Sequence, residues 1–103
     1  MFLNVFRNRK RADIDAEAYA ADAARMVATA QTLPGFVSYQ HFHADDGEAV
    51  SISEWASAEE AKAWAGHPDH LAVQARGRAE YYQSYASYCC ADPRVSRFER
   101  PDA

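Results

Sequence analysis

Residues 34–55, PGFVSYQHFHADDGEAVSISEW, decide the fold. Pro and Gly at 34–35 end whatever helix precedes them, and DDG at 45–47 is typical of a tight hairpin turn. Residues that favour strands flank the turn on both sides, so we expect strands over residues 36–44 and 48–55. The stretch therefore predicts a helix end followed by two antiparallel strands.

Upstream of this hairpin the sequence predicts a strand and a long helix. Apolar and polar residues with strand propensity alternate over residues 2–8, which indicates a first strand. Asp13 is the expected N-cap of a helix that runs to about Leu33. This segment is rich in alanine, and its apolar residues recur at spacings of three and four.

Downstream, Ser57 with Glu60 three residues later forms a capping box, which predicts the start of a second helix. Gly-His-Pro at 66–68 interrupts that helix, and it resumes over residues 69–80. A Tyr-rich segment, 81–90, is the expected fourth strand. Residues 94–100 alternate weakly and predict a short fifth strand.

The resulting order, β-α-β-β-α-β, is that of an α+β, ferredoxin-like domain with helices on one face of an antiparallel sheet. We expect one domain over residues 1–103, with a core over 2–90 and a tail over 91–103. Simple alternation places Phe36 and Tyr39, and likewise Tyr82 and Tyr85, on opposite faces of their strands. Both faces then carry bulky side chains, which predicts a homodimer that covers the second face.

Composition narrows the function classes. The net charge is −4, so a nucleic-acid partner is not expected. We interpret the basic residues at positions 7 and 9–11 as a solubilising strand end, with a nucleic-acid or membrane patch as the alternative. No apolar run approaches the length of about 18 residues that a membrane span requires, and no leader is recognisable.

The chain has two cysteines, Cys89 and Cys90, and they are adjacent. Consecutive strand residues point to opposite faces, so an ordinary disulfide between them is not expected. We interpret both as free thiols in a reducing compartment and expect a cytoplasmic protein; a redox or metal site is the alternative.

The hairpin, the segment SAEEAKAWAGHPDH at 57–70 and the Tyr-rich strand together resemble the antibiotic-biosynthesis monooxygenase superfamily of dimeric α/β barrels. The resemblance extends from residue 2 to about residue 90. It implies a pocket between sheet and helices. It also implies one of two chemistries: oxidation of polycyclic aromatic polyketides by O₂ without a cofactor, or binding and degradation of haem through an Asn, a Trp and a His that ligates iron.

Carried over residue by residue, the resemblance places Asn8 and Trp64 where the haem-degrading members have their Asn and Trp. The ligand position falls on Gln74, a poor substitute for an imidazole, so haem is disfavoured. His70 lies one helical turn earlier. We expect no cofactor and no metal.

Asn8, Trp64 and His70 are therefore the predicted catalytic residues. Asn8 would donate a hydrogen bond to a quinone or peroxo oxygen, or else be a strand-end residue bonded to backbone or water. Trp64 would form a pocket wall, or else pack in the core. His70, next to the possible N-cap Asp69, would be a general base for a phenolic proton, or else a partly exposed capping residue.

Weaker candidates surround these three. Phe6, Gln74, Tyr85 and Arg78 are predicted to contact a substrate, although Arg78 also suits a helix end, where cations complement the dipole. His41-Phe42-His43 places two imidazoles on one strand face, where an edge or dimer-interface position is favoured over metal binding.

Three hypotheses follow. The first is a small, cofactor-independent monooxygenase that acts on an aromatic or quinol-type molecule. The second is a non-catalytic dimer that binds a small hydrophobic ligand or serves stress tolerance. The third, disfavoured by Gln74, is haem binding or degradation.

Overall fold

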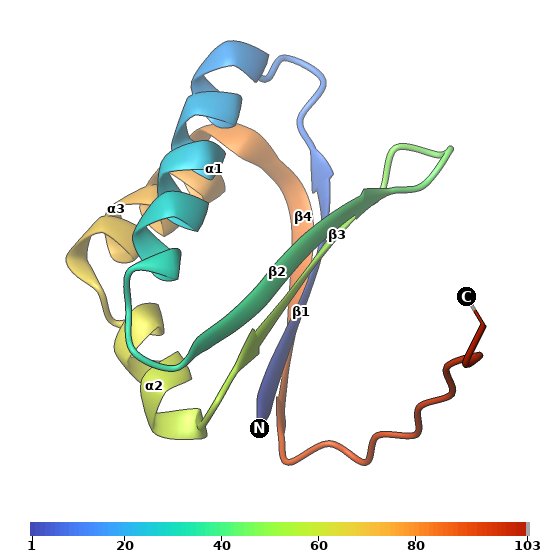
Figure 1. Cartoon of the computed structure of the whole chain (residues 1–103). Coiled ribbons are helices and arrows are strands. Elements are labelled where there is room, and N and C mark those ends of the chain that lie inside the picture. Colours follow the sequence, from blue (N-terminus) through green and yellow to red (C-terminus); the bar gives the residue numbers. More distant parts are fainter. Residues whose placement is uncertain (103) are drawn as a thin grey trace.

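The computed structural model describes residues 1–102, and Figure 1 shows their arrangement. Four strands and three α-helices alternate along the chain, with one short π-helix (η1) before the last strand. Their bounds are β1 Phe2–Lys10, α1 Ala16–Gln31, β2 Phe36–His43, β3 Ala49–Trp55, α2 Ala58–Ala65, α3 Pro68–Arg76, η1 Gly77–Tyr81 and β4 Tyr82–Ala91.

The strands form one antiparallel sheet in the order β2-β3-β1-β4. All three α-helices lie on the same side of it, and the other side carries no helix (Figure 1). This arrangement confirms the α+β, ferredoxin-like fold. The tail of the expected domain includes Ala103, which lies outside the described residues.

The β2–β3 hairpin turns as the sequence predicts. Gly47 has a φ of 93°, in the left-handed region where glycine is favoured. The Asp46 carboxylate accepts a hydrogen bond of 3.1 Å from the Glu48 amide, and the Ala44 amide donates to the Glu48 carbonyl at 2.8 Å. These bonds satisfy the backbone of the turn and fix the hairpin register.

Two helix caps differ from the prediction. Asp15, rather than Asp13, caps α1 and accepts from the Ala18 amide at 3.0 Å, whereas Asp13 pairs with Arg11. His67, rather than Asp69, caps α3, because its Nδ1 accepts from the Asp69 amide at 3.1 Å. The proline at 68 then occupies the first helical position, where a missing N–H costs nothing.

The remaining helical segments follow the prediction closely. Ser57 caps α2 and accepts from the Glu60 amide at 3.2 Å, as expected from the capping box. The predicted helix over 69–80 is divided into α3 and the π-helical turn η1, and β4 begins one residue later than expected.

Two register shifts overturn the predicted face assignments. One lies between Phe36 and Ser38 in β2, and the other lies where β4 pairs with Arg9 and Lys10. Each extra residue reverses the alternation of the strand beyond it. Phe36 and Tyr39 therefore lie on the same face, and so do Tyr82 and Tyr85; both pairs line one cavity on the helix side.

The predicted fifth strand over residues 94–100 is wrong. After β4, Asp92 adopts a positive φ of 47° and the chain turns away from the sheet (Figure 1). The segment has no strand partner among residues 1–102, so it forms no β-ladder despite its weak alternation.

The buried core lies at one end of the helix-covered face. Trp55 is only 1% exposed and packs with Ala30 and Ala61. Its ring meets Phe36 edge-on at 5.6 Å and lies nearly parallel to Trp64 at 6.4 Å. The hairpin predicted from the sequence thus ends in the residue that joins the sheet to α1 and α2.

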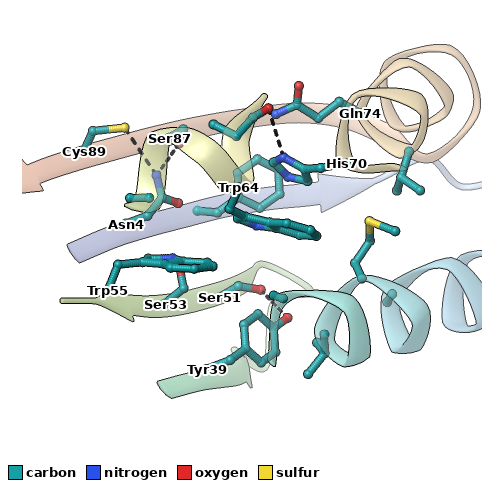
Figure 2. A pocket seen from close by; sticks show the side chains of 18 of the residues that line it. Asn4, Tyr39, Ser51, Ser53, Trp55, Trp64, His70, Gln74, Ser87 and Cys89 are labelled. Carbon is teal, nitrogen blue, oxygen red and sulfur yellow. Dashed lines mark hydrogen bonds between the residues drawn. The ribbon is translucent and has the colours of Figure 1, made fainter. Parts of the chain in front are cut away.

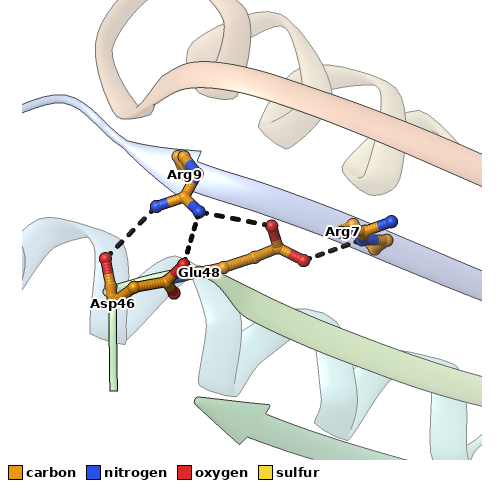
Figure 3. A network of polar contacts seen from close by, with 4 residues as sticks. All are labelled: Arg7, Arg9, Asp46 and Glu48. Atoms are coloured by element: carbon orange, nitrogen blue, oxygen red, sulfur yellow. Dashed lines mark hydrogen bonds and ion pairs between the residues drawn. The ribbon is translucent and has the colours of Figure 1, made fainter. Parts of the chain in front are cut away.

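Arg7 and Arg9 of β1 pair with carboxylates on the opposite face (Figure 3). Arg7 donates to Glu48 at 2.7 Å, and Arg9 donates to the Asp46 carboxylate at 2.8 Å. The pKa of Glu48 is held below its ordinary value, first by the hydrogen bond from Arg7. These pairs agree with a solubilised strand end. Separately, among residues 1–102 no helix has the length and apolarity needed to cross a membrane.

Candidate functional site

A cavity of about 550 Å³ lies between the sheet and the helices. Its walls are mostly aromatic and aliphatic, with a few polar groups on the sheet side, as is usual for small-molecule sites. The aromatic and histidine side chains that line it are Phe2, Phe6, Tyr19, Phe36, Tyr39, Trp55, Trp64, His70, Tyr81, Tyr82 and Tyr85.

The sheet side of the cavity carries polar side chains from three strands (Figure 2). Asn4 of β1 donates from Nδ2 to Ser87 Oγ at 3.1 Å and to Cys89 Sγ at 3.3 Å. Both amide hydrogens of Asn4 are therefore engaged, and its carbonyl oxygen remains an acceptor for a ligand hydroxyl. Ser51 and Ser53 of β3 line the same side.

The helix side carries a stacked pair, Trp64 of α2 and His70 of α3. Their ring centroids lie 4.5 Å apart with an angle of 21° between the planes. His70 Nδ1 lies 3.4 Å from the Ala65 carbonyl, a contact that Nδ1–H makes as a donor and that leaves Nε2 as the basic nitrogen. Burial lowers the pKa of His70, so the neutral ring prevails near pH 7.

Five of the seven residues predicted for the site line this cavity: Phe6, Trp64, His70, Gln74 and Tyr85. Phe6 and Tyr85 come from neighbouring strands, and their centroids lie 5.2 Å apart. Figure 2 shows Gln74 on α3 near His70. The break at Pro68 is what brings His70 over Trp64, because it starts a new helix after α2.

Two predicted residues do not line this cavity. Asn8 is 3% exposed but lies beyond its end, where its side-chain oxygen accepts a hydrogen bond from Lys10 Nζ. Arg78 is exposed on η1. Asn4, four residues before Asn8 on the same strand face, occupies the cavity instead. The alternation of β1 contained the signal for Asn4, because Asn4 and Phe6 are two residues apart and therefore share a face of the strand.

Sequence reasoning also missed a charged cluster that joins α1 to the end of α3. The Asp22 carboxylate accepts from Arg76 at 2.9 and 3.0 Å, from Arg25 at 3.1 Å and from the Tyr81 hydroxyl at 2.6 Å. The hydrogen bonds from Arg76 and Tyr81 hold the pKa of Asp22 below its ordinary value. Asp22 and Tyr81 line the cavity, so this cluster closes one part of its wall.

Residues that could hold a metal or haem are few. Within the described part of the chain, three or more His, Cys, Asp or Glu side chains nowhere gather around one point. His41 and His43 lie on the edge strand β2, with ring centroids 4.7 Å apart, which agrees with the predicted edge position. For haem, the resemblance places the ligand position at Gln74, whose amide is a poor iron ligand, while His70 lies one turn earlier and is stacked on Trp64.

Comparison with known proteins gives the class to which the chain belongs. Residues 1–76 match the antibiotic biosynthesis monooxygenase family. The chain is a member of that family, as its sequence resemblance predicted.

Among individual relatives, YqjZ of Bacillus subtilis (strain 168), described as uncharacterised, is 35% identical over 68 residues. The match covers 66% of this chain and 60% of YqjZ, so it spans less than two thirds of that relative's length.

Solved structures share the fold. Rv0793 from Mycobacterium tuberculosis superposes with a TM-score of 0.78 at 21% identity. The superposition covers 93% of this chain and 98% of the Rv0793 chain. SnoaB from Streptomyces nogalater, described as a cofactor-independent oxygenase, superposes with a TM-score of 0.74 at 19% identity, covering 97% of this chain and 96% of its own. At these identities the likeness establishes the architecture alone.

Proposed function

We propose that this protein is a cofactor-independent monooxygenase that oxidises an electron-rich aromatic molecule of the phenol, anthrone or quinol type. The observation that carries the proposal is the His70 imidazole, stacked on Trp64 across a largely apolar cavity from the polar side chains of the sheet. Membership of the monooxygenase family supports the reaction class. The fold shared with SnoaB supports only the framework.

The chemistry needs a base, a dry site and oriented polar groups. His70 Nε2 removes a proton from the bound substrate, and the resulting anion transfers one electron to O₂. The substrate radical and superoxide then combine into a carbon-bound peroxide. For an anthrone methylene, loss of water from this peroxide leaves a carbonyl, so one CH₂ and one O₂ become one C=O and one H₂O.

The other cavity residues would bind and orient. Trp64 offers a flat face to an aromatic ring, and Asn4 takes the orienting role that the sequence assigned to Asn8. The Asn4 carbonyl oxygen would accept a substrate hydroxyl, because both of its amide hydrogens are already engaged. Phe6 and Tyr85 would enclose the remaining part of a planar ligand.

We also propose that the working form is a homodimer that buries the helix-free face of the sheet. Phe42 and Tyr88 on this face are 51% and 47% exposed. Alternation places Leu3, Val5 and Ile52 beside them, opposite the cavity-lining residues of the same strands. Exposed apolar side chains grouped on one sheet face are typical of a surface that a second copy covers.

We further propose a cytoplasmic location, because both cysteines are free thiols, as is usual in a reducing compartment.

Oxygen consumption with anthrone tests the proposed reaction. The wild-type protein should consume O₂ and form anthraquinone, and His70→Ala should lower the rate by about a hundredfold, the usual contribution of a general base. Leu71→Ala is the matched control, because Leu71 follows His70 on α3, is 49% exposed and does not line the cavity. Equal rates for wild type and His70→Ala would remove His70 from the mechanism.

The two alternatives have their own readouts. Saturable binding of anthrone without O₂ uptake would favour the non-catalytic ligand-binding dimer. Haemin added to the pure protein should leave its Soret band unshifted, since Gln74 stands at the ligand position. A shifted Soret band that is lost in His70→Ala would instead establish haem binding.

A further inference from the structure

Three side chains connect the cavity to the edge of the sheet at some distance from the stacked Trp64–His70 pair. The Tyr39 hydroxyl lies 3.0 Å from Ser51 Oγ, and Ser51 Oγ lies 2.7 Å from His41 Nδ1. Tyr39 and Ser51 line the cavity, whereas His41 does not. Figure 2 shows the Tyr39 hydroxyl directed at Ser51 from the neighbouring strand.

The bulge in β2 makes this arrangement. Without the extra residue after Phe36, alternation would turn Tyr39 and His41 to the helix-free face. With it, both side chains lie beside Ser51 of β3, because Tyr39 pairs with Ser53 and His41 pairs with Ser51 in the ladder. β2 is the edge strand of the sheet, and His41 is only partly buried, so protons can exchange with water there.

The serine hydroxyl suits a relay because it has one hydrogen and two lone pairs. It accepts from the Tyr39 hydroxyl and donates to His41 Nδ1 when the imidazole carries its hydrogen on Nε2. A single shift of both hydrogens moves one proton from Tyr39 to His41. Both links are within ordinary hydrogen-bond distance, and no water is needed between them.

The surroundings of His41 favour its neutral form. His43 and Tyr39 flank it on β2, Ser51 faces it from β3, and Lys10 approaches from β1. Burial, followed by the charges of His43 and Lys10, lowers the pKa of His41. The imidazole is therefore neutral near pH 7, with a lone pair for Ser51.

We propose that Tyr39, Ser51 and His41 form a proton relay that carries the proton of a cavity-bound phenol to the edge of the sheet. The ligand hydroxyl gives its proton to the Tyr39 oxygen as the Tyr39 proton passes to Ser51 and the Ser51 proton passes to His41 Nδ1. His41 then releases its Nε2 proton to water and is left as the Nδ1–H tautomer, so proton exchange with water must restore the Nε2–H tautomer before the next transfer. Tyr39 and Ser51 end the cycle with one hydrogen each, and the ligand is left as the phenolate.

The relay rests on the proposed function for its substrate class and adds a second proton-accepting route to His70. It assigns ligand recognition to the hydroxyl group, so a phenol bound toward Tyr39 is ionised without contact with His70. Tyr39 is the only relay member that would touch the ligand oxygen; Ser51 and His41 act through it as positioning and proton-exchanging residues.

Nitrogen NMR of the histidine side chains tests the relay without any ligand. In the wild type, His41 should be the Nε2–H tautomer, with Nδ1 shifted by the hydrogen bond from Ser51. Ser51→Ala should remove that shift, and Ser53→Ala, a serine that lines the same cavity, should leave it in place. An Nδ1–H tautomer in the wild type, or a His41 spectrum unchanged in Ser51→Ala, would overturn the relay.

Alizarin, a hydroxyanthraquinone whose colour reports its ionisation, tests the transfer step. Relative to the wild type, Ser51→Ala and Tyr39→Phe should slow the ionisation of the bound dye after a pH jump by about tenfold or more, as followed by stopped-flow absorbance. Equal rates would overturn the relay. Failure of the wild type to bind the dye would count against the proposed cavity function, and NMR would then decide the relay by itself. Absence of O₂ uptake with anthrone would overturn the proposed reaction while leaving both readouts valid.

Discussion

The two faces of the sheet are built from the same four strands but differ in every other respect. The helix-covered face holds Trp55, which is 1% exposed, and the cavity with its polar floor. The helix-free face leaves Phe42 about half exposed and places the Arg7–Glu48 ion pair beside its apolar residues. We therefore assign the proposed small ligand to the helix-covered face and the proposed second copy to the helix-free face.

The difference shows how a small domain divides its side chains. Adjacent residues of a strand point to opposite faces, so Asn4 lines the cavity while Val5 lies on the helix-free face. A short chain buries a limited fraction of its surface, and the open face is where further burial is available. Substitutions on the helix-covered face should therefore lower stability, whereas substitutions on the helix-free face should weaken self-association.

The largest effect is expected at the core of the covered face. Trp55→Ala removes a ring that packs on Phe36 and Trp64, so we expect the free energy of unfolding to fall by about 3–5 kcal/mol. Urea denaturation followed by circular dichroism measures it. Phe98→Ala, at an 80% exposed tail residue, is the control and should leave the urea midpoint in place. An unchanged midpoint for Trp55→Ala would show that the core lies elsewhere.

Next comes the charged cluster that fixes α3 over the cavity. Asp22→Asn loses the charge that Arg76 and Arg25 neutralise, and we expect a loss of about 2 kcal/mol of stability at pH 7. Since the native pKa of Asp22 lies below its unfolded value of about 3.9, its contribution is complete above that pH. It disappears as the pH falls through the native pKa.

Urea titrations of wild type and Asp22→Asn at a series of pH values check both statements. The difference between the two free energies of unfolding should stay constant from pH 7 to about pH 5 and shrink below about pH 4. A difference that grows as the pH falls would mean that the sign of the Asp22 contribution is wrong.

A smaller effect is expected on the open face. Phe42→Lys should weaken self-association by about tenfold or more while leaving the fold intact, because it places a charge in the proposed interface. Sedimentation equilibrium measures it. Leu71→Lys is the matched control, because Leu71 is 49% exposed but belongs to α3 on the helical layer. A one-chain mass for the wild type would refute the dimer directly.

The smallest effect is expected at the ion pair between Arg7 and Glu48. Arg7→Gln leaves the Glu48 carboxylate partly exposed to water and still 3.5 Å from the Arg9 guanidinium, so the urea midpoint should hardly move. A large loss of stability in a dilute, one-chain sample would show that the pair supports the fold rather than only its surface.

Much of this architecture was predictable because its signals are local. The PG and DDG turns, the Ser57 cap and the alternation of β1 each depend on a few neighbouring residues. The faces of β2 and β4 were not, because one bulged residue reverses a whole strand and leaves no pattern in composition.

The site, too, was predictable only in part. Trp64 and His70 were predictable from the resemblance, and the structure brings their rings together. Asn8, which the resemblance also suggested, lies outside the cavity, and Asn4 of the same strand lines it. The contact between Asp22 and Tyr81 joins segments far apart in sequence, so no local pattern predicts it.

The central claim is that the helix-covered cavity binds a planar aromatic molecule, and tryptophan fluorescence tests it most directly. The chain has two tryptophans, and both Trp55 and Trp64 line the cavity. Titration with alizarin should quench their emission saturably at one dye per chain. Ala23→Phe, which narrows the cavity from α1, should weaken this binding by about tenfold. Quenching that does not saturate, or that is identical in Ala23→Phe, would contradict the account.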